Sequence, residues 1–458
     1  MPRILKTALI LILVALSIAA SAQTASPTPT QFDSIKKVVL DNGLTILVRS
    51  EPGSRLVAVS AMVRAGTSEE TIMNAGTGYY VSQLLLASTV VSSADKVATI
   101  ADSVGGNLSS QWNSDYTELK AVTTSTMFNE TISLMAECLM QADFDKSWVE
   151  RTRSDLIRQM LDDTAPPFEK TYMKLKELLY QDNGYRRLPY GLERVIRTVS
   201  PEDLRRFHTT YYVPNNTVVA VVGDVTPELA VERVKLAFAG WVAKPLPKRL
   251  PVPDETMDMF RSSVAEADTE VAYLMVGWLA PSVKSSDFAA VSVAGNALGG
   301  GKGSLMFRRL RQEMGMGYEI GTTYPRLRNQ SHLMAYVATD PFKFDPQYGG
   351  PSVVIDEVKT NLLKMVDELK TSPLTDKDLQ RAKGYTIGQF AMTHQHLAER
   401  ASDLAWFETV GVGYDMYQRF PDEIEKVTAA DILRVVRTYL DKYAVVVLLP
   451  KGRPTETP

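Results

Sequence analysis

The chain has 458 residues, of which 45% are hydrophobic and 22% are charged, and its formal net charge is −3. This composition is typical of a globular protein, and the length allows two or three domains of about 150 residues. A slightly acidic chain without a basic block is an unlikely nucleic-acid binder, and the single cysteine, Cys138, excludes an intrachain disulfide and a cysteine metal cluster.

The N-terminus has the layout of a secretory signal peptide. Arg3 and Lys6 precede the apolar stretch "ALILILVALSIAA", and a small-residue cleavage site ends at Ala22. The apolar stretch, about 13 residues long, is too short to favour a spanning helix. We therefore expect residues 1–22 to be a signal peptide and 23–34 a flexible leader. The mature chain is expected to be exported, to the periplasm or the medium, without a membrane span.

The first predicted element after the leader is a β-hairpin. In "VVLDNGLTILV" two β-branched runs flank Asn42-Gly43, a pair that suits a type I′ turn. The next predicted elements, in chain order, are a strand at "RLVAVSAMV", a helix at "GTGYYVSQLL" (76–85), helices near 93–105 and 126–141 with the strand "TELKAVTT" between them, a helix through "WVERTRSDLIRQMLDD", a helix at "SPEDLRRFHTTYY" and the strand "NTVVAVVGDV".

The helix at 76–85 places three polar side chains on one face. Tyr79, Ser82 and Gln83 lie at i, i+3 and i+4, which is a common way for a helix to present catalytic or metal-binding groups. These three, however, are a phenol, an alcohol and an amide, so the spacing alone predicts no particular chemistry.

A proline-rich segment separates two halves that repeat. Four prolines lie within nine residues in "KPLPKRLPVPDE", which predicts a linker at 245–256. Beyond it, "VTAADILRVVRTY" from Val427 matches "VSPEDLRRFHTTY" from Val199, an offset of 228 residues. The same offset brings "VVAVV" onto "VVLLP" and Arg153 onto Arg381. We therefore predict a duplicated α+β unit, with lobes at 35–244 and 257–450, a tail at 451–458, and a cleft between the lobes. In each lobe we expect helices to cover one face of the sheet.

The histidines do not predict a metal site. The chain has His208, His332, His394 and His396, and only His396 has a carboxylate at a helical spacing, Glu399 at i+3. No third ligand joins that pair, so we interpret all four as surface or internally bonded histidines.

The stretch "LGGGKGSLMFRRLRQEMGMGY" (298–318) is the richest in unusual residues. The stretch begins with a loop that consists of Gly299, Gly300, Gly301, Lys302 and Gly303. Four glycines in five residues predict a mobile or closely approached backbone. The loop does not have the sequence pattern of a phosphate loop. The following helix carries Arg308, Arg309 and Arg311 and ends at Gly315, and Tyr318 begins a β-like run. Arg311 and Tyr318 can thus converge. On this chemistry alone, surface charge and a core tyrosine are the better interpretation.

Taken together and in order, several stretches resemble one family. "LDNGLTILV", "VRAGTSEE", "GTGYYVSQLL", "GGNLSSQWNSDYT", "YYVPNNTVVAVVGDV" and "LGGGKGSLMFRRLRQEMGMGY" resemble the landmarks of the insulinase/pitrilysin-like metallopeptidases. Mitochondrial processing peptidase and the core subunits of the cytochrome bc complex are similar. The resemblance covers about residues 35–450. It implies two homologous α+β lobes that meet around a chamber, in which extended peptides are expected to add as a strand to a sheet edge.

The resemblance also implies a zinc site that this sequence does not keep. Active members carry H-x-x-E-H on the helix that is "YYVSQ" here, so Tyr79, Ser82 and Gln83 replace two ligands and the general base. The implied third ligand is Gln159, and the supporting glutamate is Thr152. Ser109-Ser110 also replaces the usual Asn-Ala. We therefore expect no metal or other cofactor in this chain.

The second half keeps the pair that the family uses on the substrate. Catalytically complete members have an arginine and a tyrosine seven residues apart, and Arg311 and Tyr318 keep that separation. The resemblance implies that they grip the substrate backbone and stabilise the tetrahedral intermediate, and that residues 299–303 belong to the same substrate-binding region. In bacterial two-chain members one chain carries the zinc motif and the other this pair.

The sequence is therefore identified as a non-catalytic subunit of an exported heteromeric zinc peptidase. Its expected partners are a homologous chain with an intact H-x-x-E-H motif and extended peptide substrates. The alternatives left open are a purely structural scaffold and a peptide-binding module without hydrolysis.

Overall fold

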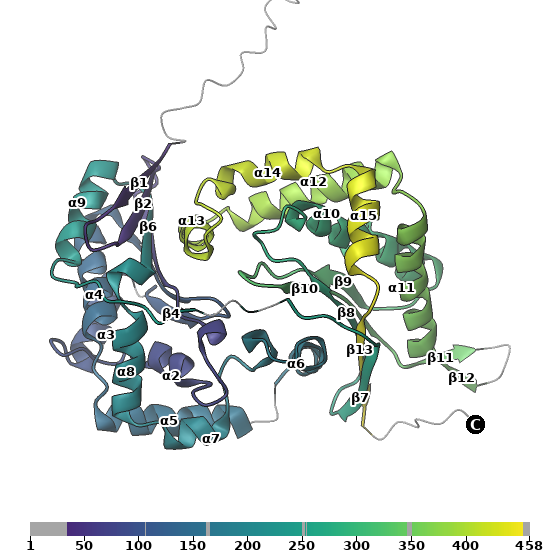
Figure 1. Cartoon of the computed structure of the whole chain (residues 1–458), viewed down its shortest axis with the longest axis horizontal. Coiled ribbons are helices and arrows are strands. Elements are labelled where there is room, and N and C mark those ends of the chain that lie inside the picture. Colours follow the sequence, from purple (N-terminus) through teal and green to yellow (C-terminus); the bar gives the residue numbers. More distant parts are fainter. Residues whose placement is uncertain are drawn as a thin grey trace, which may run out of the picture. The chain divides into compact units, whose positions relative to one another are not determined.

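The computed structural model describes residues 34–105, 107–161, 165–249, 252, 254–345 and 350–451 (Figure 1). The predicted signal peptide, nearly all of the leader and most of the tail lie outside these residues, as do Pro251 and Pro253 of the linker. Within the described part of the chain, no helix has both the length and the apolar composition that a membrane span requires.

The N-terminal half, from β1 to α9, is built on a six-stranded sheet. Its strand order is β1 (Ile35–Val39), β2 (Thr45–Ser50), β6 (Thr217–Gly223), β3 (Leu56–Val63), β5 (Thr117–Thr124) and β4 (Ser109–Trp112). Its helices are α2 (Thr77–Leu84), α3 (Ala94–Ser103), α4 (Phe128–Gln141), α5 (Lys146–Leu161), α6 (Pro167–Leu179), α7 (Glu193–Thr198), α8 (Pro201–Tyr211) and α9 (Pro227–Ala237), with short 3₁₀ turns η2 (Thr67–Glu69), η3 (Ser125–Met127), η4 (Gly184–Arg186) and η5 (Pro214–Asn216). Valines at alternate positions of β3 and β6 form the core with α2, α4 and α9.

The C-terminal half, from β7 to β13, repeats this order. Its five-stranded sheet runs β7 (Arg261–Ala267), β13 (Ala444–Pro450), β8 (Ala272–Ala280), β10 (Ser331–Thr339) and β9 (Glu319–Thr323). The remaining elements are α10 (Phe288–Gly299), the π-helix η6 (Phe307–Glu313), the hairpin β11 (Phe342–Asp345) and β12 (Gly350–Val353), and helices α11 (Val354–Thr371), α12 (Asp376–Thr393), α13 (Leu397–Val410), α14 (Met416–Lys426) and α15 (Ala429–Tyr439). In both sheets the last strand along the chain lies between a parallel and an antiparallel neighbour, β6 between β2 and β3, and β13 between β7 and β8.

The predicted duplication is confirmed by matching details. Helices α8 and α15 begin 228 residues apart, and each begins with a capping box. In α8 the pair is Ser200 and Asp203, and in α15 it is Thr428 and Asp431. Each box satisfies backbone N–H groups that the first helical turn leaves without partners.

One helix of each half packs on the sheet of the other half. Helix α6 lies on β8, β13 and β7 of the second sheet, and α13 lies on β3, β6 and β5 of the first (Figure 1). The opposite face of each sheet is covered by other helices of the same half, so each sheet is covered on both faces. We predicted helices on only one face of each sheet. The sequence pattern does not show which sheet a helix covers, so the exchange of α6 and α13 was not predicted.

Buried polar side chains fix these two exchanged helices. On the first sheet, the Glu118 carboxylate accepts hydrogen bonds from Ser60 (2.6 Å) and from Ser402 of α13 (2.5 Å). On the second sheet, His332 bonds to the hydroxyls of Tyr172 in α6 and of Tyr180, the residue that follows α6, each at 2.8 Å. Both His332 nitrogens therefore have partners, as buried polar atoms require.

The predicted type I′ turn at Asn42-Gly43 is wrong. The Gly43 N–H donates to the Leu40 carbonyl (2.8 Å), so Asp41 and Asn42 occupy the centre of the turn. A type I′ turn needs positive φ at both central residues, and Arg55 is the only non-glycine residue with positive φ in the described chain. Gly43, with φ 85°, follows the turn in the left-handed region, as in three-residue hairpin loops.

His332 should make the stability of the fold depend on pH. Burial lowers its pKa from 6.5 to about 3, so between these values the unfolded chain binds a proton that the folded chain does not. The contribution of neutral His332 is complete above pH 6.5 and is lost as the pH falls, by roughly 2 kcal/mol between pH 7 and 5.

The test is His332→Gln, whose side chain does not titrate. Chemical denaturation should show that the variant loses roughly 2 kcal/mol less than the wild type between pH 7 and 5. Groups common to both proteins, such as His208 and Glu70, cancel in this difference. An equal loss in the two proteins would contradict the assignment.

Candidate functional site

The N-terminus of α2 is held in place by a buried carboxylate and two glycines. Glu70 accepts hydrogen bonds from the N–H groups of Gly76 (3.0 Å) and Gly78 (2.7 Å), and its burial raises its pKa to about 7. Gly76 has φ 102°, and a Cβ atom on Gly78 would lie 2.0 Å from the Trp112 ring. The strand-to-helix connection thus determines where the face of α2 points.

The residues at the motif positions contact one another across α2 and α5. The Tyr79 hydroxyl donates to the Gln159 side-chain oxygen at 3.4 Å, and burial raises the pKa of Tyr79. The Ser82 hydroxyl is buried and donates to the backbone carbonyl of Tyr79 at 2.6 Å. Gln83 is exposed, and Thr152 lies half-buried on α5. The fold therefore brings Tyr79 and Gln159 together, as the resemblance implied.

These side chains do not fit a zinc ion. Zinc in proteins is held by thiolate, imidazole and carboxylate, and none of the four positions supplies one. A phenol whose pKa is raised stays protonated at neutral pH, so Tyr79 offers no anionic oxygen. Nowhere in the described residues do three His, Cys, Asp or Glu side chains come together as a metal site would require.

Arg311 and Tyr318 converge on the surface of the C-terminal half. The Arg311 guanidinium carbon lies 5.8 Å from the centre of the Tyr318 ring, and 59% of Tyr318 is exposed. Arg311 lies in the last turn of η6, while the Tyr318 N–H donates to the Ala338 carbonyl of β10 at 2.7 Å. Gly317, with φ 79°, joins them, and a Cβ atom there would lie 2.8 Å from Ile320. The two groups can point at one oxygen atom of a ligand.

The glycine-rich loop is closely approached by α12. Arg381 donates to the carbonyls of Gly300 (2.9 Å) and Asn296 (3.0 Å) at the end of α10. A Cβ atom on Gly301 would lie 2.6 Å from the Tyr385 ring. The predicted close approach is therefore confirmed, but the approaching groups belong to the chain itself.

The remaining glycines of the loop are approached in the same way. A Cβ atom on Gly303 would lie 2.8 Å from Cδ of Arg381, and one on Gly299 would lie 2.6 Å from the methyl group of Thr322. Packing within the chain thus accounts for glycine at both positions without a bound peptide. A role in substrate binding stays a prediction for the whole loop, that is, for Gly299, Gly300, Gly301, Lys302 and Gly303.

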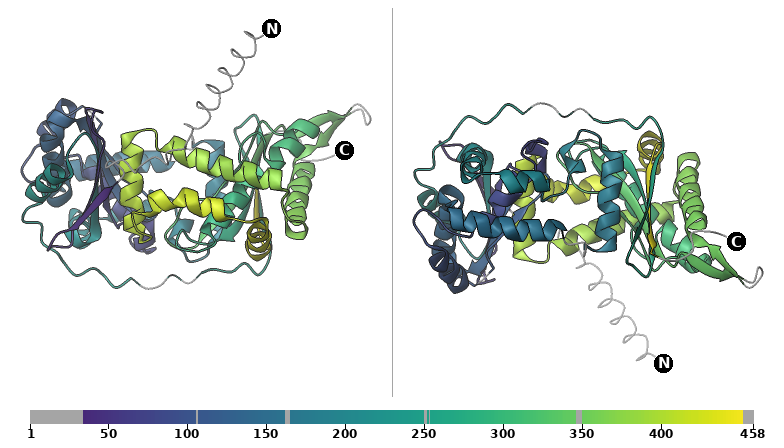
Figure 2. Two further views of the ribbon diagram at one scale, coloured as in Figure 1. Left: turned by 90° about the horizontal axis from the view of Figure 1, so that it is seen from above. Right: turned by 90° about the horizontal axis from the view of Figure 1, so that it is seen from below.

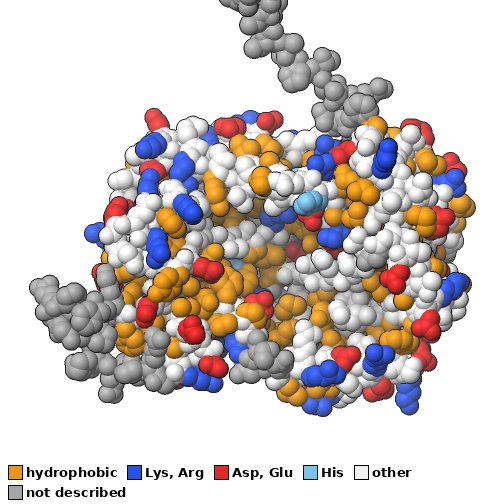
Figure 3. Space-filling model, turned by 180° about the vertical axis from the view of Figure 1, so that it is seen from behind, with side chains coloured by type: hydrophobic (Ala, Val, Ile, Leu, Met, Phe, Trp, Pro, Cys, Tyr) orange, Lys and Arg blue, Asp and Glu red, His pale blue; other side chains and the backbone are white. Residues whose placement is uncertain are grey.

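A free sheet edge adjoins an open pocket. Strand β4, which carries Ser109 and Ser110, is the edge strand of the first sheet. A pocket of about 770 Å³ lies beside it and reaches Lys120 of β5 and His396 at the start of α13. Seen from behind, the molecule is hollowed near its centre, and hydrophobic side chains gather beside the hollow (Figure 3). An extended peptide could bind along such an edge.

The sequence missed some of these features. Residues 307–313 form a π-helix, whereas we expected an α-helix, and no residue type in the stretch signals that change. The histidines are as we interpreted them: His208 bonds to the Leu139 carbonyl (2.9 Å), His394 bonds to Asp403 (2.8 Å), and His396 is exposed. However, His394 and His396 flank the junction of α12 and α13 and do not share one helix.

Family models match both halves of the chain. One described as "Insulinase (Peptidase family M16)" matches residues 45–187, and one described as "Peptidase M16 inactive domain" matches residues 198–385.

Individual relatives match over nearly the whole length. The zinc protease PqqE of Helicobacter pylori is 24% identical over 418 residues, which cover 88% of this chain and 90% of that protein. A peptidase M16 inactive domain from Pseudomonas fluorescens has a similar structure, with TM-score 0.80, 17% identity, and coverage of 93% of this chain and 100% of that one. The periplasmic protease PqqL of Escherichia coli gives TM-score 0.73 at 16% identity, over 91% of this chain and 48% of that one. Since family models cover most of both halves and the duplicated fold agrees with them, this chain belongs to the insulinase (M16) peptidase family.

Proposed function

We propose that this chain is the non-catalytic subunit of an exported heteromeric zinc peptidase. It supplies Arg311 and Tyr318 in trans to a homologous chain that carries the H-x-x-E-H motif, and the complex cleaves extended peptides. The observation that carries the proposal is the contrast between the two halves. The face of α2 offers no metal ligand, whereas Arg311 and Tyr318 lie in contact on the surface.

The chemistry of the pair suits an oxyanion. A guanidinium and a phenol O–H both donate hydrogen bonds, and each can donate to the carbonyl oxygen of a bound peptide as negative charge develops on it. Gly317 and the hydrogen bond from the Tyr318 N–H to β10 fix the backbone of the tyrosine before the substrate arrives, and the Arg311 guanidinium lies against its ring. Donors fixed in advance need little reorganisation in the transition state, and this makes them effective.

Export is supported by the N-terminal sequence. Residues 1–22 have the charge, apolar core and small-residue cleavage site of a signal peptide. The structural likeness to a periplasmic protease of Escherichia coli agrees with a periplasmic or secreted location.

A purely structural or peptide-binding subunit is the second candidate. The free edge of β4 and its adjoining pocket favour peptide binding, which needs neither Arg311 nor Tyr318. The two candidates differ in one respect: only the first makes hydrolysis by the complex depend on that pair.

The chain alone should bind no stoichiometric zinc and cleave no peptide, because its motif positions hold no imidazole or carboxylate. Elemental analysis of dialysed protein measures this, and about one zinc per chain with chelator-sensitive hydrolysis would contradict it. The combined variant Tyr79→His, Ser82→Glu, Gln83→His and Gln159→Glu should gain zinc binding. It should not gain full activity, since Thr152 and Ser109 also depart from the family pattern.

Tyr318→Phe should abolish most of the turnover of the assembled complex. The change removes one O–H from an exposed side chain, so folding and assembly should be unaffected. Loss of one oxyanion donor typically lowers turnover by about 10²–10³. Arg311→Lys should also impair turnover, because lysine keeps the charge but loses the planar fork. The measurement is cleavage of an unstructured peptide by the chain co-purified with its zinc-bearing partner.

Tyr414→Phe is the matched control. It removes the same group from a tyrosine whose hydroxyl makes no hydrogen bond to a described residue, so activity should be unchanged. Full activity of an intact Tyr318→Phe complex would rule out the role in trans and leave the scaffold or peptide-binding subunit.

A further inference from the structure

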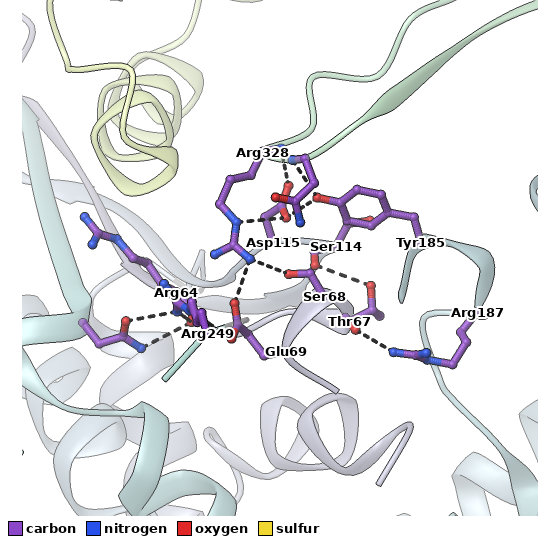
Figure 4. A network of polar contacts seen from close by, with 12 residues as sticks. Arg64, Thr67, Ser68, Glu69, Ser114, Asp115, Tyr185, Arg187, Arg249 and Arg328 are labelled. Atoms are coloured by element: carbon purple, nitrogen blue, oxygen red, sulfur yellow. Dashed lines mark hydrogen bonds and ion pairs between the residues drawn. The ribbon is translucent and has the colours of Figure 1, made fainter. Parts of the chain in front are cut away.

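Three separate segments meet at one buried carboxylate, Glu69 (Figure 4). Arg328, between β9 and β10, donates to it at 2.8 Å, and Arg249 of the linker donates to it at 2.9 Å. Glu69 itself lies in η2 of the N-terminal half, and its side chain is only 6% exposed. The Arg328 backbone N–H also donates to Asp115 (2.8 Å), which accepts from Tyr185 (2.5 Å). Both halves and the linker are therefore joined at this point.

A basic pocket of about 510 Å³ opens beside this junction. Its walls carry four cationic side chains: Lys248, Arg249, Lys284 and Arg328. Its two carboxylates are already engaged, since Glu69 bonds to both arginines and Glu70 accepts the N–H groups of α2. Positive charge is thus in excess in the pocket.

Several donors remain free for a ligand. Lys248 and Lys284 make no side-chain hydrogen bond or ion pair to a residue that the structure describes, and both are exposed. Arg249 and Arg328 each bond to the protein through Nε or Nη2, so Nη1 of each has no described partner.

The cations also repel one another. The pKa of Lys284 is lowered by partial burial and then by Arg328, with Arg64 and Arg249 adding to the effect and Asp115 opposing it. The pKa of Arg64 is lowered by burial and by Arg249 and Arg328. A bound anion would relieve this repulsion, and the gain would be largest for an anion with several charges.

We propose that this pocket binds a small anion that carries several phosphate groups, a function beyond the proposed role in peptide cleavage. Lysine ammonium groups act as point charges for phosphate, and the arginine Nη1 atoms add directional donors. The described parts of the linker run along the outside of the molecule (Figure 2), and the lining of this pocket shares no residue with the pocket beside β4. This placement argues against a peptide-substrate subsite.

Binding would also join the two halves more firmly. The pocket wall includes η2 of the first half, the linker, and the connections before α10 and β10 of the second half. An anion that touches all of them binds the folded chain and not the unfolded one, so it stabilises the folded chain by RT ln(1 + [L]/Kd), where [L] is the free anion concentration.

Calorimetric titration of the full mature chain with inorganic tripolyphosphate tests the proposal. We expect saturable one-to-one binding that weakens as salt is added. Lys248→Gln with Lys284→Gln should weaken it at least tenfold, and charge reversal of both lysines to glutamate should abolish it. The matched control is Lys96→Gln with Lys235→Gln, which changes the net charge equally on exposed faces of α3 and α9. Thermal midpoints without anion check that each variant folds.

Parallel titrations separate the sources of the anion. If a nucleoside triphosphate binds as tightly as tripolyphosphate, the pocket recognises the phosphate chain alone. If the nucleoside triphosphate binds markedly more tightly, the pocket also recognises the nucleoside. Preferential binding of an acidic peptide would overturn the proposal in favour of a peptide site. No binding to the wild type at low salt, or equal loss in the control pair, would also overturn it.

Discussion

Each sheet of this chain has one face that its own half does not cover. Helix α6 crosses from the first half to the second sheet, and α13 crosses back to the first sheet. The apolar residues on these faces, such as Met275 and Leu279 beneath Leu175 and Leu179 of α6, can leave water only when both halves are folded. Burial of an apolar side chain of this size is worth about 1.5–3 kcal/mol, so a face of several is a large part of a domain's stability. The two halves should therefore depend on each other for stability.

That dependence explains the polar contacts on the shared faces. A buried glutamate or histidine is costly unless it is bonded, and Glu118 and His332 both find their partners on the exchanged helices. Each is the second residue of its strand, Glu118 of β5 and His332 of β10. Apolar packing alone would leave α6 and α13 able to slide, whereas a bonded polar group has one position of lowest energy. The same reasoning applies to the junction at Glu69, where the linker arginine completes the contact between the halves.

The sequence predicted the parts of this arrangement that depend on local pattern. The β-branched strands and the constant offset of 228 residues each act within one segment or repeat, so the duplicated α+β fold could be predicted. The exchange of α6 and α13 could not, because amphipathic spacing shows that a helix buries one face without showing which sheet it covers. The hairpin turn was mispredicted because Asn-Gly also fits a three-residue loop, in which only the glycine needs positive φ.

The candidate site also has parts that the sequence predicted and parts that it did not. Spacing predicted that Arg311 and Tyr318 would meet, and the family resemblance predicted that Tyr79 and Gln159 would face each other, as they do at 3.4 Å. The π-helix that presents Arg311 and the basic pocket at the linker were not predictable, since the pocket gathers Lys248, Lys284 and Arg328 from segments with no common pattern.

The positions of α2 and of the backbone at Tyr318 depend on packing and backbone contacts rather than on metal ligands. In α2, glycines at 76 and 78 still fit the carbonyl of Tyr190 and the ring of Trp112, so the helix keeps its place with Tyr79 and Gln83 in it. Among the motif positions, Tyr79 is partly buried and packs against the core, whereas Gln83 and Gln159 are exposed and Ser82 bonds only to its own helix. Tyr318 also contributes little to packing, being 59% exposed, and its backbone is nevertheless fixed to β10. Two exposed groups held in contact by a glycine turn have no evident structural purpose, and this asymmetry between the halves is the physical reason to look for function at Arg311 and Tyr318 rather than at α2.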